Sequence, residues 1–95
     1  MDERLLAFFK ALSSENRQQI MLLFVGGKRM TVNEIAEAVG LGQSTASEQL
    51  AILKRAGLLT AEKAGKEVRY GPNKENILSL VDSLSAFLGR CCDCE

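Results

Sequence analysis

Apolar residues recur at helical spacing in two short segments at the start of the chain. The first spans residues 4–12, and Ser13–Ser14 then interrupts it with a residue type that commonly caps helices. The second runs from residue 15 to about residue 25, where Gly26–Gly27 ends the pattern. The pattern of apolar and polar positions therefore predicts two consecutive short helices.

A capping box predicts the start of the next helix. Thr31 can accept a hydrogen bond from the third helical amide while Glu34 reaches back to the backbone of Thr31. This helix ends at Gly40, and after the tight turn Leu41–Gly42 a second helical pattern runs through residues 43–56. Two helices joined by so short a turn are typical of a helix-turn-helix motif.

The second helix of this motif has two unlike faces. Ala46, Leu50 and Leu53 recur at helical spacing, so we expect them to be buried. The N-terminal part of the opposite face is polar and consists of Gln43, Ser44, Thr45, Ser47, Glu48 and Gln49. Gly57 ends the helix.

The remaining pattern predicts a β-hairpin followed by a last helix. Residues 58–63 and 67–71 have an extended, alternating pattern around the turn at residues 64–66. Asn73 can cap a final helix that ends at Gly89. The predicted fold class is mainly α with a short β-hairpin, and the order ααααββα is that of a winged helix-turn-helix.

Composition limits the class of protein. The chain has 95 residues, of which 46% are hydrophobic and 25% charged, as in one globular domain. We expect residues 1–90 to form a DNA-binding and dimerisation domain and residues 91–95 to form a cysteine-containing tail. No histidine, glycine-rich phosphate loop or recognisable pair of carboxylates is present, so we expect no enzyme. Without a long apolar run or a signal-peptide pattern, the chain is expected to be cytoplasmic and to have no membrane contact.

Local charge favours DNA as a partner although the formal net charge is zero. Between Leu41 and Lys74 six basic residues stand against three acidic ones. The cations predicted to contact phosphates are Lys54, Lys63, Lys66 and Arg69. The side chains predicted to contact base edges are Gln43, Ser44, Thr45, Ser47 and Gln49.

Other interpretations of this polar face stay open. Phosphates repel the Glu48 carboxylate unless it accepts from a cytosine amino group or pairs with a cation. The face is also compatible with a solvated helix surface, or with a winged helix that binds another protein.

Five segments between Leu6 and Tyr70 form a specific pattern in order and spacing. They are residues 9–17, 33–36, 41–50, 53–59 and 68–70. This pattern resembles the arsenic-repressor family of metal-sensing winged-helix transcriptional repressors. The resemblance implies a homodimer joined through the first and last helices, which binds double-stranded operator DNA with inverted-repeat symmetry and is released by an inducer.

The chain departs from the family in its recognition helix, where Glu48 and Gln49 stand in place of a frequent Arg or Lys followed by His. This departure bears on the operator sequence rather than on the fold. Apart from the resemblance, Leu78 lies outside the main apolar stripe of the last helix. That surplus apolar surface indicates a dimer contact, unless Leu78 covers the first helix of its own chain.

Two metal sites of the family are absent. Its thiolate pair would fall at Thr31 and Asn33, neither of which is a soft ligand. Its zinc-type site on the last helix needs imidazoles, but Leu84 stands at the matching position after Asp82 and histidine is absent.

All three cysteines, Cys91, Cys92 and Cys94, lie in the last five residues. Three thiolates on one ion suit trivalent arsenic or antimony, and we expect one of these as the inducer. We expect no permanently bound cofactor. Cadmium, lead, mercury, copper(I) and zinc are the less favoured inducers. Zinc in particular prefers four ligands and would need one from outside the three thiols. The alternatives are a repressor that senses oxidants or sulfur species through the same thiols, and thiols without a role.

Overall fold

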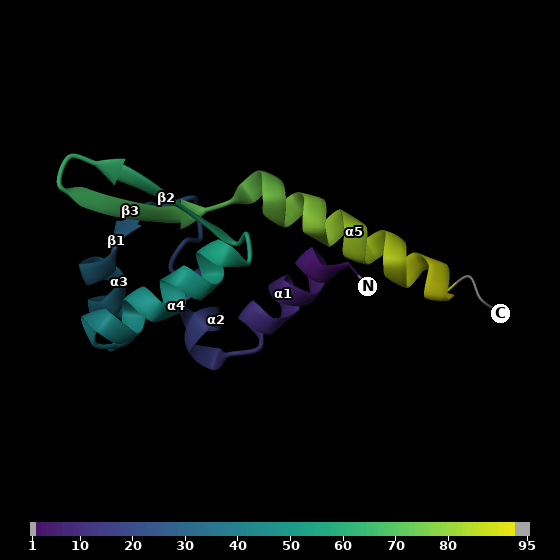
Figure 1. The fold of residues 1–95 in the computed structure, drawn as a ribbon, viewed down its shortest axis with the longest axis horizontal. Helices are drawn as coiled ribbons and strands as arrows, with labels where there is room; N and C mark the ends of the chain where they lie inside the picture. Colours follow the sequence, from purple (N-terminus) through teal and green to yellow (C-terminus); the bar gives the residue numbers. More distant parts are fainter. Residues whose placement is uncertain (1, 93–95) are drawn as a thin grey trace.

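The helices and the hairpin follow one another in the predicted order. The computed structural model describes residues 2–92. Its elements, labelled in Figure 1, are α1 (Glu3–Leu12), α2 (Glu15–Leu22), β1 (Met30–Thr31), α3 (Val32–Val39), α4 (Gln43–Arg55), β2 (Leu59–Ala64), β3 (Glu67–Pro72) and α5 (Lys74–Cys92). The winged helix-turn-helix class is confirmed, with one short strand added.

Side-chain caps begin the helices where the sequence predicts them. The Ser14 hydroxyl accepts from the backbone N–H of Arg17 at 3.3 Å. At the start of α3 the Thr31 hydroxyl accepts from the Glu34 N–H, and the Glu34 carboxylate accepts from the Thr31 N–H at 2.9 Å. The Asn73 side chain accepts from the N–H of Asn76 at 3.3 Å, as a cap of α5. These hydrogen bonds satisfy amides that have no partner within the helix.

Two predicted helix ends are wrong. We expected the second helix to reach about Val25, but α2 ends at Leu22. The next three N–H groups donate to carbonyls three residues back, a tighter turn that buries Phe24. The last helix was expected to end at Gly89, yet α5 continues to Cys92. A single glycine costs roughly 1 kcal/mol in a helix interior, which is too little to end a long helix.

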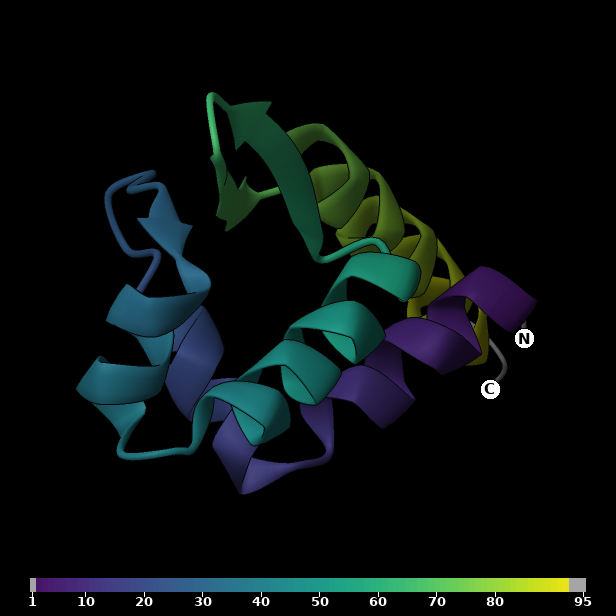
Figure 2. The same ribbon diagram turned by 60° about the vertical axis from the view of Figure 1, so that its left-hand side comes forward.

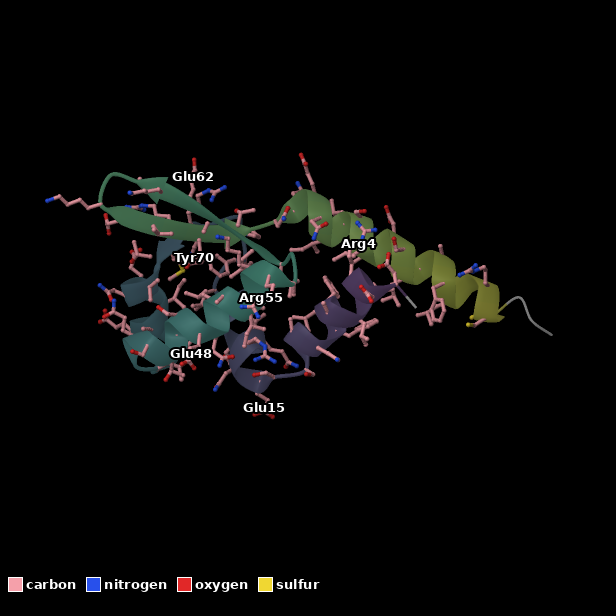
Figure 3. The ribbon with its side chains drawn as sticks, viewed as in Figure 1. Arg4, Glu15, Glu48, Arg55, Glu62 and Tyr70 are labelled. Carbon is pink, nitrogen blue, oxygen red and sulfur yellow. The ribbon has the colours of Figure 1, made fainter. Side chains whose placement is uncertain are left out.

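The hairpin belongs to a three-stranded antiparallel sheet with the order β1-β3-β2. Ala64 pairs with Glu67 beside the turn, and Leu59 pairs with Pro72 at the other end, so β2 is shifted by one residue from the expected 58–63 and β3 extends one residue beyond the expected 67–71. Gly65 has φ +65°, which suits a glycine in a two-residue hairpin turn. Tyr70, which Figure 3 places between the sheet and the helices below it, pairs with Met30 of β1. We call β2, β3 and their turn the wing.

One hydrophobic core joins the helices to the base of the sheet. The predicted inner face of α4 is confirmed, because Ala46, Leu50 and Leu53 are all fully buried. Around α4 lie buried side chains from the other helices and from the start of the wing, namely Leu5, Phe8, Ala11, Ile20, Phe24, Ile35, Leu58, Leu59 and Leu80. Within residues 2–92, no helix is both long and apolar enough to cross a lipid bilayer.

The last helix is only partly covered by its own chain. It packs along α1 and projects beyond the other elements (Figures 1 and 2). With this helix included, the molecule has extents of 54 × 24 × 22 Å. Leu78 is 54% exposed, so it does not serve to cover α1 of its own chain. The large apolar side chains that these two helices leave exposed are Leu78, Val81 and Leu88 of α5 and Leu6 and Phe9 of α1, and together we call them the apolar face.

The capping box makes stability depend on pH. The hydrogen bond from the Thr31 N–H holds the pKa of Glu34 below its ordinary value of 4.5. Its stabilisation is therefore fully present above the unfolded-state pKa and is lost as the pH falls through the folded-state pKa. We expect Glu34→Gln to lower the thermal midpoint most near pH 7 and least in acid, measured by circular dichroism against the exposed control Glu37→Gln. A midpoint difference that stays constant with pH would contradict this account.

Candidate nucleic-acid interface and cysteine pair

The first half of α4 presents a polar face to solvent. Gln43, Ser44, Thr45 and Ser47 are all exposed, as is Glu48, while Ala46 on the inner face anchors the helix. Gly42 is the N-cap of α4 and has no side chain to accept from the first amides. These N–H groups add to the hydrogen-bond donors of the face and give it a partial positive charge. The predicted base-reading surface is thus solvent-accessible, apart from Gln49.

Gln49 is half-buried and already has a partner. Its side-chain oxygen accepts from the Arg17 guanidinium at 2.9 Å, which fixes the orientation of its amide group within the protein. The sequence pattern placed Gln49 on the polar face but gave no sign of this partner, since 32 residues separate the two. Glu48 has no such contact within the described chain, and Figure 3 shows it on the side of α4 away from the sheet.

The wing carries three exposed cations, Lys63, Lys66 and Arg69. Arg69 lies 3.9 Å from the Glu67 carboxylate, a long and solvent-exposed ion pair that contributes little. A groove of about 270 Å³ between the wing and the starts of α3 and α4 is lined by Thr31, Val32, Asn33, Gln43, Lys66, Glu67 and Val68. The fold therefore places one predicted phosphate contact, Lys66, across a groove from one predicted base contact, Gln43.

Lys54 lies apart from these residues. It is exposed in the last turn of α4, eleven residues and roughly 16 Å along the helix from Gln43. Arg55, one of the six basic residues between Leu41 and Lys74 but not one of the predicted phosphate contacts, is exposed beside it. Its only sequence signal is its place in the basic last turn of α4.

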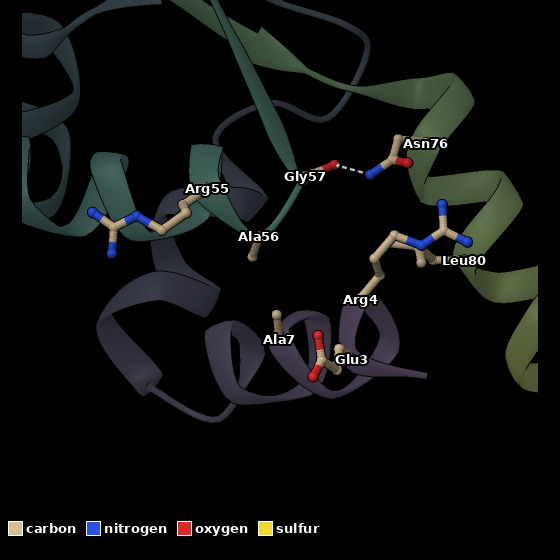
Figure 4. Close-up of a pocket in the computed structure, with 8 residues that line it drawn as sticks. All are labelled: Glu3, Arg4, Ala7, Arg55, Ala56, Gly57, Asn76 and Leu80. Carbon is tan, nitrogen blue, oxygen red and sulfur yellow. Dashed lines mark hydrogen bonds between the residues drawn. The ribbon is translucent and has the colours of Figure 1, made fainter. Parts of the chain in front are cut away.

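A second groove, of about 260 Å³, lies between α1, the end of α4 and the start of α5 (Figure 4). Asn76 of α5 donates to the Gly57 carbonyl at 2.9 Å and thereby ties α5 to the end of α4. Gly57 has φ +83°, and a Cβ atom there would collide with the Asn76 amide, so only glycine fits. The groove has an alanine floor and a rim of mixed charge, and it brings together no set of catalytic groups.

The two described cysteines occupy the last turn of α5, and both are exposed. Cys91 continues the series Ile77, Leu80, Leu84 and Phe87 on the side that packs toward α1. Cys92 continues the series Leu78, Val81, Ser85 and Leu88, which includes the α5 part of the apolar face. The two thiols therefore lie on neighbouring faces of α5, in a part of the chain that was expected to be a tail.

Cys94, the third predicted ligand, lies outside the described residues. Within residues 2–92 no three cysteine or carboxylate side chains are close enough together to hold a metal ion. At the positions of the two family metal sites that this sequence lacks, the residues have structural roles. Thr31 caps α3, and Leu84 packs against the core.

Comparison with known proteins agrees with this geometry. The family model described as bacterial regulatory protein, arsR family, matches residues 14–61. YbzH of Bacillus subtilis, an uncharacterised HTH-type transcriptional regulator, is 38% identical over 90 residues, covering 80% of this chain and 90% of YbzH. CadC of Listeria innocua, a cadmium resistance regulatory protein, is 36% identical over 75 residues, covering 79% of this chain but only 63% of CadC.

A solved structure shares the fold. The homodimeric winged helix-turn-helix DNA-binding domain of Mb0332 from Mycobacterium bovis is 28% identical and has a TM-score of 0.74, with 98% of this chain and 85% of that chain covered. Fold, polar helix face and sequence similarity lead to one conclusion. This chain belongs to the arsR family of bacterial regulatory proteins and is a DNA-binding transcriptional regulator, not an enzyme.

Proposed function

We propose that the chain is a dimeric repressor that binds operator DNA through α4 and the wing, and that leaves it when a thiophilic metalloid or metal binds Cys91, Cys92 and Cys94. The observation that carries the proposal is the place of the cysteines. Two of them lie in the last turn of α5, and Cys92 continues the apolar face that the chain leaves uncovered. A ligand bound there acts on the surface through which two copies would meet.

Operator binding is supported by two kinds of surface, a polar one on α4 and a positively charged one on the wing. The exposed side chains of Gln43, Ser44, Thr45 and Ser47 offer donors and acceptors suited to base edges in a major groove. Lys63, Lys66 and Arg69 on the wing, and Lys54 at the end of α4, offer positive charge to the flanking phosphates.

Dimerisation is supported by the apolar face. Exposed Leu78, Val81 and Leu88 follow one another at spacings of three and seven residues along α5 and lie beside exposed residues of α1. Two identical faces can cover each other about a two-fold axis, which would place two α4 helices on an operator with inverted-repeat symmetry. The similar domain of Mb0332 is itself homodimeric.

The inducer class follows from the ligands. Three thiolates favour trivalent arsenic or antimony over harder cations. Cadmium, lead, mercury, copper(I) and zinc are the less favoured candidates, and the similarity to CadC makes cadmium the first of them to test. To act as inducer, the ligand must favour a dimer arrangement that fits the operator less well, by about 1–3 kcal/mol for a typical allosteric coupling.

A thiol-based redox or sulfur-species sensor of the same fold is the second candidate. Its supporting observation is that the Cys91 and Cys92 thiols are both exposed, as a reactive thiol must be. It differs from the first candidate in leaving a changed protein mass or a disulfide instead of a bound metalloid.

Wing cations are expected to bind phosphates without reading sequence. Lys63→Ala, Lys66→Ala and Arg69→Ala should each weaken binding to all DNA sequences alike and lower the slope of log affinity against log salt by about one for each phosphate left without its cation. Fluorescence anisotropy on an operator selected by the protein from a random DNA pool measures both. Lys10→Ala on α1 is the matched control, and an unchanged slope in all three wing variants would contradict the assignment.

The apolar face is expected to hold the dimer. Leu78→Glu should give a monomer in sedimentation and weaken operator binding by roughly a hundredfold or more, because two linked half-site contacts become one. Ser79→Glu adds the same charge to the neighbouring exposed position outside the apolar face and should remain dimeric. A dimeric Leu78→Glu protein would show that copies meet elsewhere.

The cysteines are expected to carry the response but not the DNA affinity. Arsenite or antimonite should release the reduced wild-type protein from its operator, whereas the triple variant Cys91→Ser, Cys92→Ser, Cys94→Ser should bind the operator equally well and not respond. Cadmium and zinc are titrated in parallel by the same anisotropy measurement. A triple variant that still responds would refute the thiolate site, and release only by an oxidant or a persulfide would favour the second candidate.

A further inference from the structure

We infer that Arg17 is a positioning residue for DNA binding, which fixes α4 relative to the end of α1 by joining Gln49 to two α1 carbonyls. The inference rests on the proposed operator binding and moves Gln49 from reading bases to holding the helix in place. Neither residue needs to touch DNA for this role.

The Arg17 guanidinium makes three hydrogen bonds at once. Its Nε donates to the Ala11 carbonyl at 2.6 Å, and its Nη2 donates to the Lys10 carbonyl at 3.1 Å. Both carbonyls lie in the last turn of α1, and the Lys10 carbonyl also accepts from the N–H and the hydroxyl of Ser13 at the helix end. Its Nη1 donates to the side-chain oxygen of Gln49, in the middle of α4, at 2.9 Å. A planar guanidinium holds these acceptors in a fixed arrangement that a lysine ammonium cannot reproduce.

Beside Arg17 the gap between α1 and α4 is lined in part by alanine side chains, while Phe8 and Ala11 of α1 pack in the common core. A groove of about 210 Å³ separates the two helices and is lined by Ala7, Lys10, Ala11, Arg17, Ile52, Arg55 and Ala56. Figure 4 shows Ala7 and Ala56 facing each other from the two sides. Alanine side chains do not interdigitate, so they set the distance between helices only weakly. On its other side α4 is held by the fully buried Leu50 and Leu53.

The same contact links the apolar face to the DNA-binding helix. Leu6 and Phe9 of that face lie on α1, whose last two turns also contain both carbonyls that Arg17 binds. A displacement of α1 within the dimer would therefore pass through one rigid side chain to the middle of α4. Positioning of this kind changes affinity for all operators together, whereas base reading changes the preference at one base pair.

The test compares Gln49→Leu, Gln49→Glu, Arg17→Met and the double variant Arg17→Met, Gln49→Leu on the selected operator, with Gln19→Leu at an exposed glutamine of α2 as control. We expect Gln49→Leu and Arg17→Met each to weaken binding roughly tenfold to a hundredfold, the scale of a hydrogen bond to a charged group. The double variant should be little weaker than either single variant. Gln49→Glu should bind nearly as well as wild type, because its carboxylate still accepts from Arg17.

Gln49→Leu keeps both bonds from Arg17 to α1, so it carries the test if Arg17→Met does not fold. Binding is repeated on operators with each base pair changed in turn, and the order of preference should match that of wild type. Gln49→Leu binding within twofold of wild type, a loss confined to one base pair of each half-site, or Gln49→Glu as weak as Gln49→Leu would each overturn the inference. A wild-type protein that selects no operator would instead refute the proposed function.

Discussion

Burial of one face of α4 is the constraint on which the structure depends. Ala46, Leu50 and Leu53 are removed from solvent completely, and side chains from the other helices and the base of the wing gather around them. Because the inner face is anchored in the core, the outer face of the same helix is held out to solvent in a defined orientation. Because α4 has one face in the centre of the core and one polar face in solvent, the elements packed against it can adopt few other positions.

The fold was largely predictable because its signals are local. A capping box at Thr31 and Glu34, a helix end at Gly40 and a hairpin turn within residues 64–66 each act within a few residues, and each is found where the sequence predicts it. The errors arise where local signals compete. Phe24 is drawn into the core by a tighter turn than the apolar pattern of α2 implied, and the helical turns around Gly89 outweigh its poor propensity. Strand β1 has only two residues, too few to show an alternating pattern.

The candidate site, like the fold, was predictable where local patterns define it and not where distant residues meet. Helical spacing was enough to find the polar face of α4, and the order of charges was enough to find the cations of the wing. What spacing could not show is which polar side chains are engaged inside the protein. Gln49 and Arg17 meet only because two helix pairs pack at a particular distance, and no periodicity encodes a contact between residues so far apart in the chain. The cysteines were visible from their clustering alone, whereas their division between two faces of α5 required the helix to be seen to continue.

The exposed apolar residues of α5 tie the stability of the proposed dimer to its concentration. In the proposed dimer, the burial of Leu78, Val81 and Leu88 by a second copy adds to the stability of the folded chain. Folding and association are then coupled, and the temperature of unfolding rises with protein concentration. The number of molecules in the cell then sets both how much regulator is folded and how much is assembled.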